Sequence, residues 1–266
     1  MPKVALGDLE LFYRLDGPQE APLLVLANGI FQRTEAWDGL LPYLEGFRVL
    51  RYDMRGQGQS QVPPKPYTPE VHADDLAALL QALGLEDYTL LGLSNGGVVA
   101  QVYATRQPSG LQRLILLCTT PRLDPLLRAK VESWRWALEE GGTLGRLQVA
   151  LPWVWGRAYL EAHPELTSQE ALAQMLASAP GLEAQHNLLE GFLALEDLRP
   201  RLAQIHTPTL VLSGEEDLLF PPRYGQEIAQ AMPNAHFRVL PQVGHVAPLE
   251  NPALLAAEIR SFMEAV

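Results

Sequence analysis

The sequence predicts an α/β protein built on a mostly parallel sheet, and three observations carry this prediction. Short continuous apolar runs, such as Leu23–Ala27 and Leu111–Leu117, alternate with stretches of helical periodicity. Such runs are typical of strands covered on both faces, as in sheets flanked by helices. The alternation stops at Pro121 and resumes near residue 201, with helical periodicity and no convincing strand between. We therefore predict an eight-stranded sheet flanked by helices, with a helical cap inserted into it.

The first elements are a hairpin, a buried strand and a helix. Residues 4–6 and 9–15 alternate in polarity around Gly7-Asp8, which indicates a tight antiparallel turn. The apolar run 23–27 ends in Asn28-Gly29-Ile30-Phe31. Helical periodicity then predicts a helix over residues 34–45. Its predicted inner face consists of Trp37, Leu40, Leu41 and Leu44.

The next strand covers residues 47–52 and is followed by a glycine-punctuated loop over 53–60. Residues 68–83 have the terminal signals of a helix, with Thr68 as a cap, Pro69 in the first turn and Gly84 as the stop. Further predicted elements are the strand 88–91, a helix from residue 98, the strand 111–117, the strand 208–213, the helix 223–231, the strand 237–240 and the helix 252–264. Residues 1–120 and 201–266 then form the core domain, and residues 121–200 form the cap.

Composition narrows the class of partner. The chain has 266 residues, is 47% hydrophobic and carries a net charge of −11, which argues against a nucleic-acid partner held by phosphate contacts. No apolar stretch approaches the ~20 residues of a membrane span, and the N-terminus lacks the features of a signal peptide. The single cysteine, Cys118, excludes an internal disulfide. We expect a cytoplasmic monomer or homodimer that binds a small molecule and not a membrane.

The segment Gly92-Leu93-Ser94-Asn95-Gly96-Gly97 lies between a predicted strand and a predicted helix. A Gly-x-Ser-x-Gly pattern in that context is a nucleophile elbow, in which a strained turn exposes the serine hydroxyl. Glycines are required because the strand and the helix approach the turn too closely for side chains. The pattern predicts Ser94 as a nucleophile.

A serine nucleophile needs a general base, and the base needs an orienting acid. Ligand sites of such sheets form at the C-terminal ends of the strands. The loops after the last two predicted strands contain Glu215, Glu216, Asp217 and His245. One helix and one strand separate these loops, so they should lie side by side. Among the three acidic residues, the spacing after Gly214 favours Asp217.

Together these motifs resemble the α/β-hydrolase fold family over nearly the whole chain outside the cap. The resemblance rests on the segments 28–31, 53–60, 92–97 and 214–217, and on Gly244-His245 followed by Glu250-Asn251-Pro252. It implies that Ser94 is the nucleophile, His245 the base and Asp217 the acid. It further implies an oxyanion hole made by the backbone N–H groups of Ile30 and Asn95.

One position departs from the common family pattern. Many members have His-Gly where this chain has Asn28-Gly29. Since the oxyanion donor is a backbone N–H that follows, Asn28 need not weaken the hole. Asn28 together with Arg51-Tyr52-Asp53 is similar to the enol-lactonase branch, such as 3-oxoadipate enol-lactonase.

The resemblance implies a hydrolase that cleaves a small or medium carboxylic ester or lactone without a cofactor or metal. Carbon–carbon bond hydrolases, thioesterases and haloperoxidase-like enzymes share the same triad and stay open, as does a ligand-binding protein with slow or absent turnover. We expect Asp53 and Arg55 to be structural, Cys118 to be a buried apolar residue, and the histidines other than His245 to bind no metal. The expected pocket residues are Phe31, Trp134, Trp136, Trp153, Trp155, Leu219 and Val246.

Overall fold

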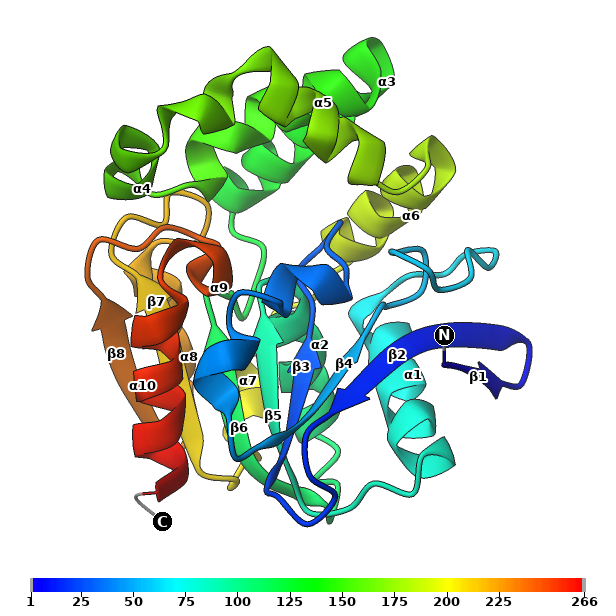
Figure 1. Ribbon diagram of the computed structural model, residues 1–266, viewed down its shortest axis with the longest axis vertical. Coiled ribbons are helices and arrows are strands. Elements are labelled where there is room, and N and C mark those ends of the chain that lie inside the picture. The colour runs from blue at the N-terminus through cyan, green and yellow to red at the C-terminus, as the bar shows by residue number, and fades with distance from the viewer. Residues whose placement is uncertain (1, 265–266) are drawn as a thin grey trace.

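An eight-stranded sheet with helices on both faces runs through the computed structural model, which describes residues 2–264 (Figure 1). The strand order is β1-β2-β4-β3-β5-β6-β7-β8. β2 pairs antiparallel with β1 and β4, and the other neighbours pair in parallel. The strands are β1 Lys3–Leu6, β2 Leu9–Asp16, β3 Leu23–Ala27, β4 Arg48–Tyr52, β5 Tyr88–Leu93, β6 Leu111–Leu117, β7 Thr209–Gly214 and β8 Ala235–Leu240. The predicted fold class is confirmed, including the N-terminal hairpin.

Each buried strand contributes side chains to two separate cores, because successive residues point to opposite faces of a sheet. In β3, Leu23 and Val25 join the core packed against α1, α2 and α8, while Leu24 and Leu26 join the core packed against α10. The helices of this domain are α1 Pro69–Ala82, α2 Asn95–Ala104, α8 Pro222–Ala231, α9 Ala247–Glu250 and α10 Pro252–Glu264. This two-sided burial explains the continuous apolar runs in the sequence.

The helix predicted over residues 34–45 differs in the structure. Two short 3₁₀ helices, η1 Thr34–Trp37 and η2 Leu41–Leu44, occupy the segment. Gly39 and Pro42 fall within it, and an interior proline removes a hydrogen bond and clashes with the preceding turn of an α-helix. Trp37, Leu40 and Leu44 are nevertheless buried, and Leu41 is partly buried, so the predicted inner face is confirmed.

The segment between β6 and β7 is helical and lies above the C-terminal edge of the sheet (Figure 1). Its elements are α3 Pro125–Val154, α4 Arg157–Ala162, η3 Pro164–Thr167, α5 Gln169–Ser178, α6 Leu182–Leu193 and α7 Arg199–Leu202. The long α3 bends at Gly142, whose φ of 61° is not helical. The parallel strands therefore direct their C-terminal loops toward this inserted cap. No helix within residues 2–264 combines the length and the apolar character required to cross a bilayer.

Candidate active site

Ser94 lies at the turn between β5 and α2 with φ 56° and ψ −119°, a conformation that residues other than glycine rarely adopt. The turn depends on its glycines. A Cβ atom on Gly92 would lie 2.3 Å from the Gly96 carbonyl oxygen, and a Cβ on Gly96 would lie 2.3 Å from the Ala27 carbonyl oxygen. The Ser94 N–H donates to the Leu117 carbonyl at 2.9 Å, which ties the turn to β6.

Ser94, His245 and Asp217 form one continuous line of hydrogen bonds. His245 Nε2 lies 2.9 Å from Ser94 Oγ, and His245 Nδ1 lies 2.8 Å from Asp217 Oδ2. All three residues are at least 95% buried, which limits competition from water. The two loops that were expected to be neighbours after β7 and β8 do meet at this point, opposite the elbow.

Asp217 is held by the backbone of its own loop. Its Oδ1 accepts hydrogen bonds from the N–H groups of Leu219 at 2.9 Å and Phe220 at 2.8 Å. This leaves Oδ2 for the imidazole of His245. The Phe220 ring meets that imidazole edge to face, with 5.0 Å between centroids, so the same loop fixes the orientation of both partners.

A second carboxylate, that of Glu250, joins the His245 loop to the cap. It accepts hydrogen bonds from the N–H groups of Gly244 at 2.7 Å, Val246 at 3.2 Å and Gly156 at 3.2 Å. Burial raises the pKa of Glu250 above its ordinary value, although these hydrogen bonds oppose the shift. In the sequence, Glu250 is recognisable only as part of the Glu250-Asn251-Pro252 motif, which indicates no role for it.

Further contacts fix the same junction. The His245 N–H donates to the Val154 carbonyl at 2.9 Å, and the Ala158 N–H donates to Glu216 Oε2 at 2.8 Å. The end of α3 and the start of α4 are thus attached to the loops that carry His245 and Asp217. Movement of the cap at this junction would disturb the imidazole directly.

The backbone N–H groups of Ile30 and Asn95, the expected oxyanion donors, have no acceptor among the described residues. The neighbouring Gly29 N–H is occupied by Gln32 Oε1 at 3.0 Å. Asn28 points elsewhere. Its Nδ2 donates to the Tyr52 carbonyl at 2.9 Å and its Oδ1 accepts from Trp37 Nε1 at 2.6 Å, so this side chain braces the loop and leaves the pocket free.

Asp53 and Arg55 act within the scaffold. The Asp53 carboxylate accepts from the N–H groups of Thr34 at 2.7 Å and Gln59 at 2.8 Å, which ties two loops together. Arg55 makes a bidentate pair with Asp75, with both N···O distances at 2.6 Å. Burial raises the pKa of the Cys118 thiol well above its ordinary value, so this cysteine is held in the unreactive thiol form.

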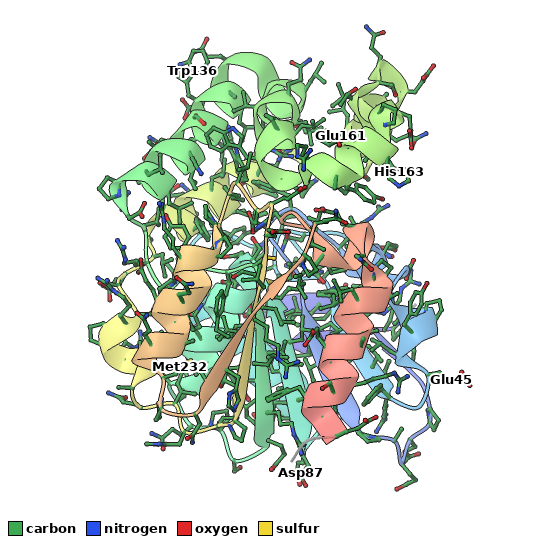
Figure 2. All side chains as sticks on the ribbon, turned by 90° about the vertical axis from the view of Figure 1, so that its left-hand side faces the viewer. Glu45, Asp87, Trp136, Glu161, His163 and Met232 are labelled. Carbon is green, nitrogen blue, oxygen red and sulfur yellow. The ribbon has the colours of Figure 1, made fainter. Side chains whose placement is uncertain are left out.

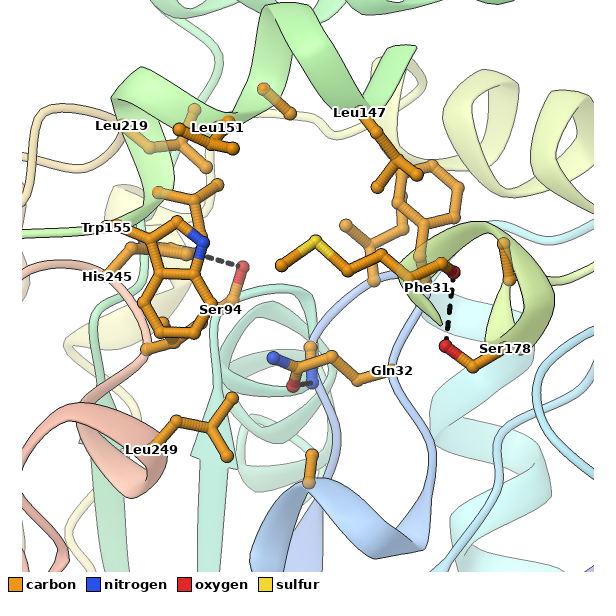
Figure 3. A pocket seen from close by; sticks show the side chains of 18 of the residues that line it. Phe31, Gln32, Ser94, Leu147, Leu151, Trp155, Ser178, Leu219, His245 and Leu249 are labelled. Carbon is orange, nitrogen blue, oxygen red and sulfur yellow. Dashed lines mark hydrogen bonds between the residues drawn. The ribbon is translucent and has the colours of Figure 1, made fainter. Parts of the chain in front are cut away.

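A cavity of about 380 Å³ opens in front of Ser94, between the core and the cap (Figure 3). In Figure 3, Trp155 and His245 lie on one side of the Ser94 hydroxyl and Phe31 on the other. The volume is typical of small-molecule sites. Its walls are mostly apolar, and they include Ile30, Phe31, Trp134, Leu147, Ala150, Leu151, Trp155, Met175, Leu219, Val246 and Leu249.

Two of the expected pocket tryptophans do not line this cavity. Trp136 is 64% exposed and stands on the outer surface of the cap (Figure 2). Trp153 packs against the core, with the Lys130 ammonium 5.2 Å from its ring centroid. The prediction that Trp136 and Trp153 line the pocket is therefore wrong. Apolar character alone does not show which face of α3 a tryptophan occupies.

Arg146 of α3 also lines the cavity, although it is not among the pocket residues expected from the sequence. Its guanidinium stacks on the Phe31 ring, 4.0 Å from the centroid, and its Nε donates to Gln185 Oε1 at 2.7 Å. The residue is only 4% exposed. Burial lowers its pKa to about 10, so it stays charged at neutral pH. One signal in the sequence could have identified Arg146: it lies one helical turn before Ala150, on the apolar face of α3, where a charged residue is unusual.

Comparison with known proteins agrees with this architecture. A family profile for the alpha/beta hydrolase fold matches residues 22–252. RutD of Pseudomonas savastanoi pv. phaseolicola, a candidate carbamate hydrolase, is 30% identical over 92% of this chain and 95% of its own length. The enol-lactonase of Burkholderia xenovorans LB400 superimposes with a TM-score of 0.87, at 30% identity over 99% of this chain and all of its own.

A thermophilic esterase from Thermogutta terrifontis, solved with malate bound, superimposes with a TM-score of 0.86. It shares 31% identity, over 100% of this chain and 99% of its own. The profile match, the relatives and the sheet topology lead to one conclusion: the chain belongs to the α/β-hydrolase fold family.

Proposed function

We propose that the protein is a serine hydrolase that cleaves a small or medium carboxylic ester or lactone through an acyl-enzyme on Ser94. The observation that carries this proposal is the hydrogen-bonded line from Ser94 Oγ through His245 to Asp217, with both distances below 3.0 Å. A buried serine hydroxyl that contacts an imidazole, itself oriented by a carboxylate, is an activated nucleophile.

In the acylation step, Ser94 Oγ attacks the carbonyl carbon while His245 Nε2 takes its proton. Asp217 holds the imidazole in the tautomer with the proton on Nδ1 and stabilises the imidazolium that forms. The tetrahedral intermediate carries an oxyanion, which the N–H groups of Ile30 and Asn95 are suited to bind. Loss of one such donor costs about 3–4 kcal/mol in enzymes of this type.

The imidazolium then donates its proton to the departing alkoxide, and the acyl group remains on Ser94. A water molecule repeats the sequence: His245 takes its proton, the hydroxide attacks the acyl carbon, and the Ser94 oxygen leaves with the proton returned by His245. A lactone differs only because its alkoxide stays attached to the acyl group. The asymmetric anchoring of Asp217 supports this cycle, since one oxygen stays fixed while the other tracks the changing charge on the imidazole.

The substrate class is supported by the cavity and by the relatives. A cavity of about 380 Å³ with mostly apolar walls suits a small or medium acyl compound. The enol-lactonase and the esterase favour an ester or lactone, and the similarity to RutD makes a carbamate the second candidate. Thioester hydrolysis, carbon–carbon bond hydrolysis and haloperoxidase-like chemistry require the same triad, and of these three the substrate panel tests thioester hydrolysis.

The test is a panel of p-nitrophenyl esters of increasing acyl length, with an enol-lactone, a thioester and a carbamate included. Ester or lactone hydrolysis should dominate, and Ser94→Ala should abolish it with nearly unchanged melting temperature. Ser133→Ala is the matched control, because the Ser133 hydroxyl donates to the Lys130 carbonyl within the cap. Full activity in Ser94→Ala, or no turnover of any acyl substrate by the wild type, would contradict the proposal.

A further inference from the structure

Arg146 is a buried cation in the active-site cavity without a carboxylate partner among the described residues. The chain has 31 acidic residues for 20 basic ones, so partners for an arginine are abundant. Yet Arg146 takes part in no ion pair within the described part of the chain, and its one hydrogen bond there comes from Nε and not from Nη1 or Nη2. Since burial of an unpaired charge is unfavourable, such an arginine calls for an explanation.

The other charged residues at the cavity are already paired. Glu35 is the only acidic residue that lines it in the described structure, and it binds Arg14 at 2.9 Å and Arg33 at 3.4 Å. Arg146 is therefore the cation at this cavity that contacts no carboxylate of the described chain. A negatively charged group that enters the cavity would meet it.

The guanidinium is also held in place in advance. Its Nε donates to Gln185 Oε1, and the Gln185 amide nitrogen donates in turn to Thr143 Oγ1 at 2.8 Å and the Pro180 carbonyl at 2.6 Å. The amide is thereby fixed with its oxygen toward Arg146. The guanidinium carbon lies over the Phe31 ring, and Nη1 and Nη2 donate to no group of the described chain, so both remain available. The edge that carries them matches the two oxygens of a carboxylate.

We propose that Arg146 is a specificity residue that binds a carboxylate on the substrate, at a distance from the bond that Ser94 cleaves. The inference rests on the proposed function and specifies its substrate class as an ester or lactone that carries a free carboxylate. Phe31, on which Arg146 stacks, directly follows Ile30 of the expected oxyanion hole. The carboxylate site and the scissile carbonyl are thus linked through consecutive residues.

The test compares each charged substrate with a neutral counterpart of the same shape. Ethyl monoesters of succinic, glutaric and adipic acid place the carboxylate on the acyl side, and acetate esters of hydroxy acids place it on the alcohol side. The neutral counterparts carry a primary amide in place of the carboxylate. Wild type should prefer the charged member in kcat/KM by roughly 10- to 100-fold at one optimal chain length, as expected for a hydrogen-bonded charge pair.

Arg146→Met should lower that preference by roughly 10- to 100-fold, and Arg146→Lys should lower it less, because charge without the planar fork is retained. The ratio of the two substrates cancels any general loss of activity. Arg135→Met is the matched control on the same helix, since the Arg135 side chain is 45% exposed and pairs with Glu132; it should leave the ratio unchanged. A ratio of one or less at every chain length on both sides, or a ratio unaffected by Arg146→Met, would overturn the inference.

A second measurement uses only the wild type, and it tests the inference even if Arg146→Met does not fold. Glutarate and glutaramide are compared as inhibitors of the wild type, and the dicarboxylate should bind at least about tenfold more tightly. Equal binding would overturn the inference. Failure of the proposed function would give a different result, namely no Ser94-dependent hydrolysis of either charged or neutral esters. In that case, calorimetric binding of glutarate and glutaramide to the wild-type chain decides whether Arg146 binds a carboxylate.

Discussion

Side chains at the two walls of the active site are fixed in different ways. In the core, backbone groups fix members of the proposed triad: Ser94 by the turn between β5 and α2, and Asp217 by the N–H groups of Leu219 and Phe220. Arg146 of the cap is fixed by other side chains, namely Gln185 of the cap and Phe31 of the core. Backbone contacts survive most substitutions, whereas side-chain contacts change with each one. From this comparison we expect substitutions in the core to affect the proposed reaction itself and substitutions in the cap to affect the choice of substrate.

The largest effect expected in the core concerns Asp217, the proposed triad acid. Asp217→Asn should lower kcat/KM by roughly 10³- to 10⁴-fold, because the imidazole loses the partner that fixes its tautomer. Glu216→Gln, one residue earlier, removes the same charge from a side chain that binds the Ala158 N–H, and should lower kcat/KM less than about tenfold. Steady-state kinetics on one ester give both values. The reverse ranking would place the acid at Glu216.

A second pair contrasts glycines of the elbow and of the cap. Gly96→Ala should destabilise the protein by about 3 kcal/mol or more, since the new Cβ would lie 2.3 Å from the Ala27 carbonyl oxygen. Gly141→Ala in α3 meets nothing within 4 Å and should be neutral or stabilise by up to about 1 kcal/mol. Urea unfolding of both variants supplies the comparison. Equal midpoints would show that the elbow is less tightly packed than described.

The same contrast explains which features the sequence could predict. The elbow glycines, the apolar runs of the strands and the Thr68 cap each depend on a few neighbouring residues, so they can be recognised in the sequence alone. The single helix predicted over residues 34–45 is wrong, because periodicity does not register the effect of Gly39 and Pro42, which favour two short 3₁₀ helices. These local signals sufficed for the fold family and for bringing Ser94, Asp217 and His245 to one rim.

Cap residues required the tertiary structure. Trp134 and Trp136 are two positions apart on α3, and only the packing of the cap decides that one is buried at the cavity and the other exposed. Arg146 is one of many arginines in the sequence, and the role proposed for it rests on the lack of a carboxylate partner within residues 2–264, which only the tertiary structure reveals. The role of Glu250 also required the tertiary structure, because one of its three N–H partners, Gly156, lies far from it in the sequence.

Glu250 tests the junction between the two regions. Glu250→Ala leaves the N–H groups of Gly244, Val246 and Gly156 without their acceptor, and should lower kcat by roughly tenfold as His245 loses its fixed position. Proteolysis near residues 154–158 should also accelerate. Glu258→Ala, which removes a surface partner of Arg238, is the control. Unchanged kcat in Glu250→Ala would restrict this residue to a structural role.

The raised pKa of Glu250 also predicts that the stability of the protein depends on pH. Because burial raises its pKa above 4.5, its neutral form favours the folded state, and that contribution is present below pH 4.5 and lost as the pH rises through the raised value. The free energy of unfolding of wild type relative to Glu250→Gln should therefore fall between pH 4 and pH 7. A difference that rises with pH would mean that the hydrogen bonds to the carboxylate outweigh its burial.

The smallest expected effect concerns the wall of the cavity. Trp155 lines it and stacks on Tyr159 at 5.3 Å, so Trp155→Leu should shift the preferred ester chain length, with changes of roughly 3- to 10-fold in relative kcat/KM. Trp136→Leu, on the outer surface of the cap, should leave the profile unchanged. A shift of equal size in both variants would contradict the assignment of the cavity walls.

The central claim, that Ser94 is the activated nucleophile, is tested most directly by covalent labelling of the folded protein with a fluorophosphonate followed by peptide mass analysis. The account predicts one adduct per chain, located on Ser94, with labelling strongly slowed in His245→Ala. A folded wild-type protein that gains no adduct, or that gains it on another residue while Ser94 stays unmodified, would contradict the account.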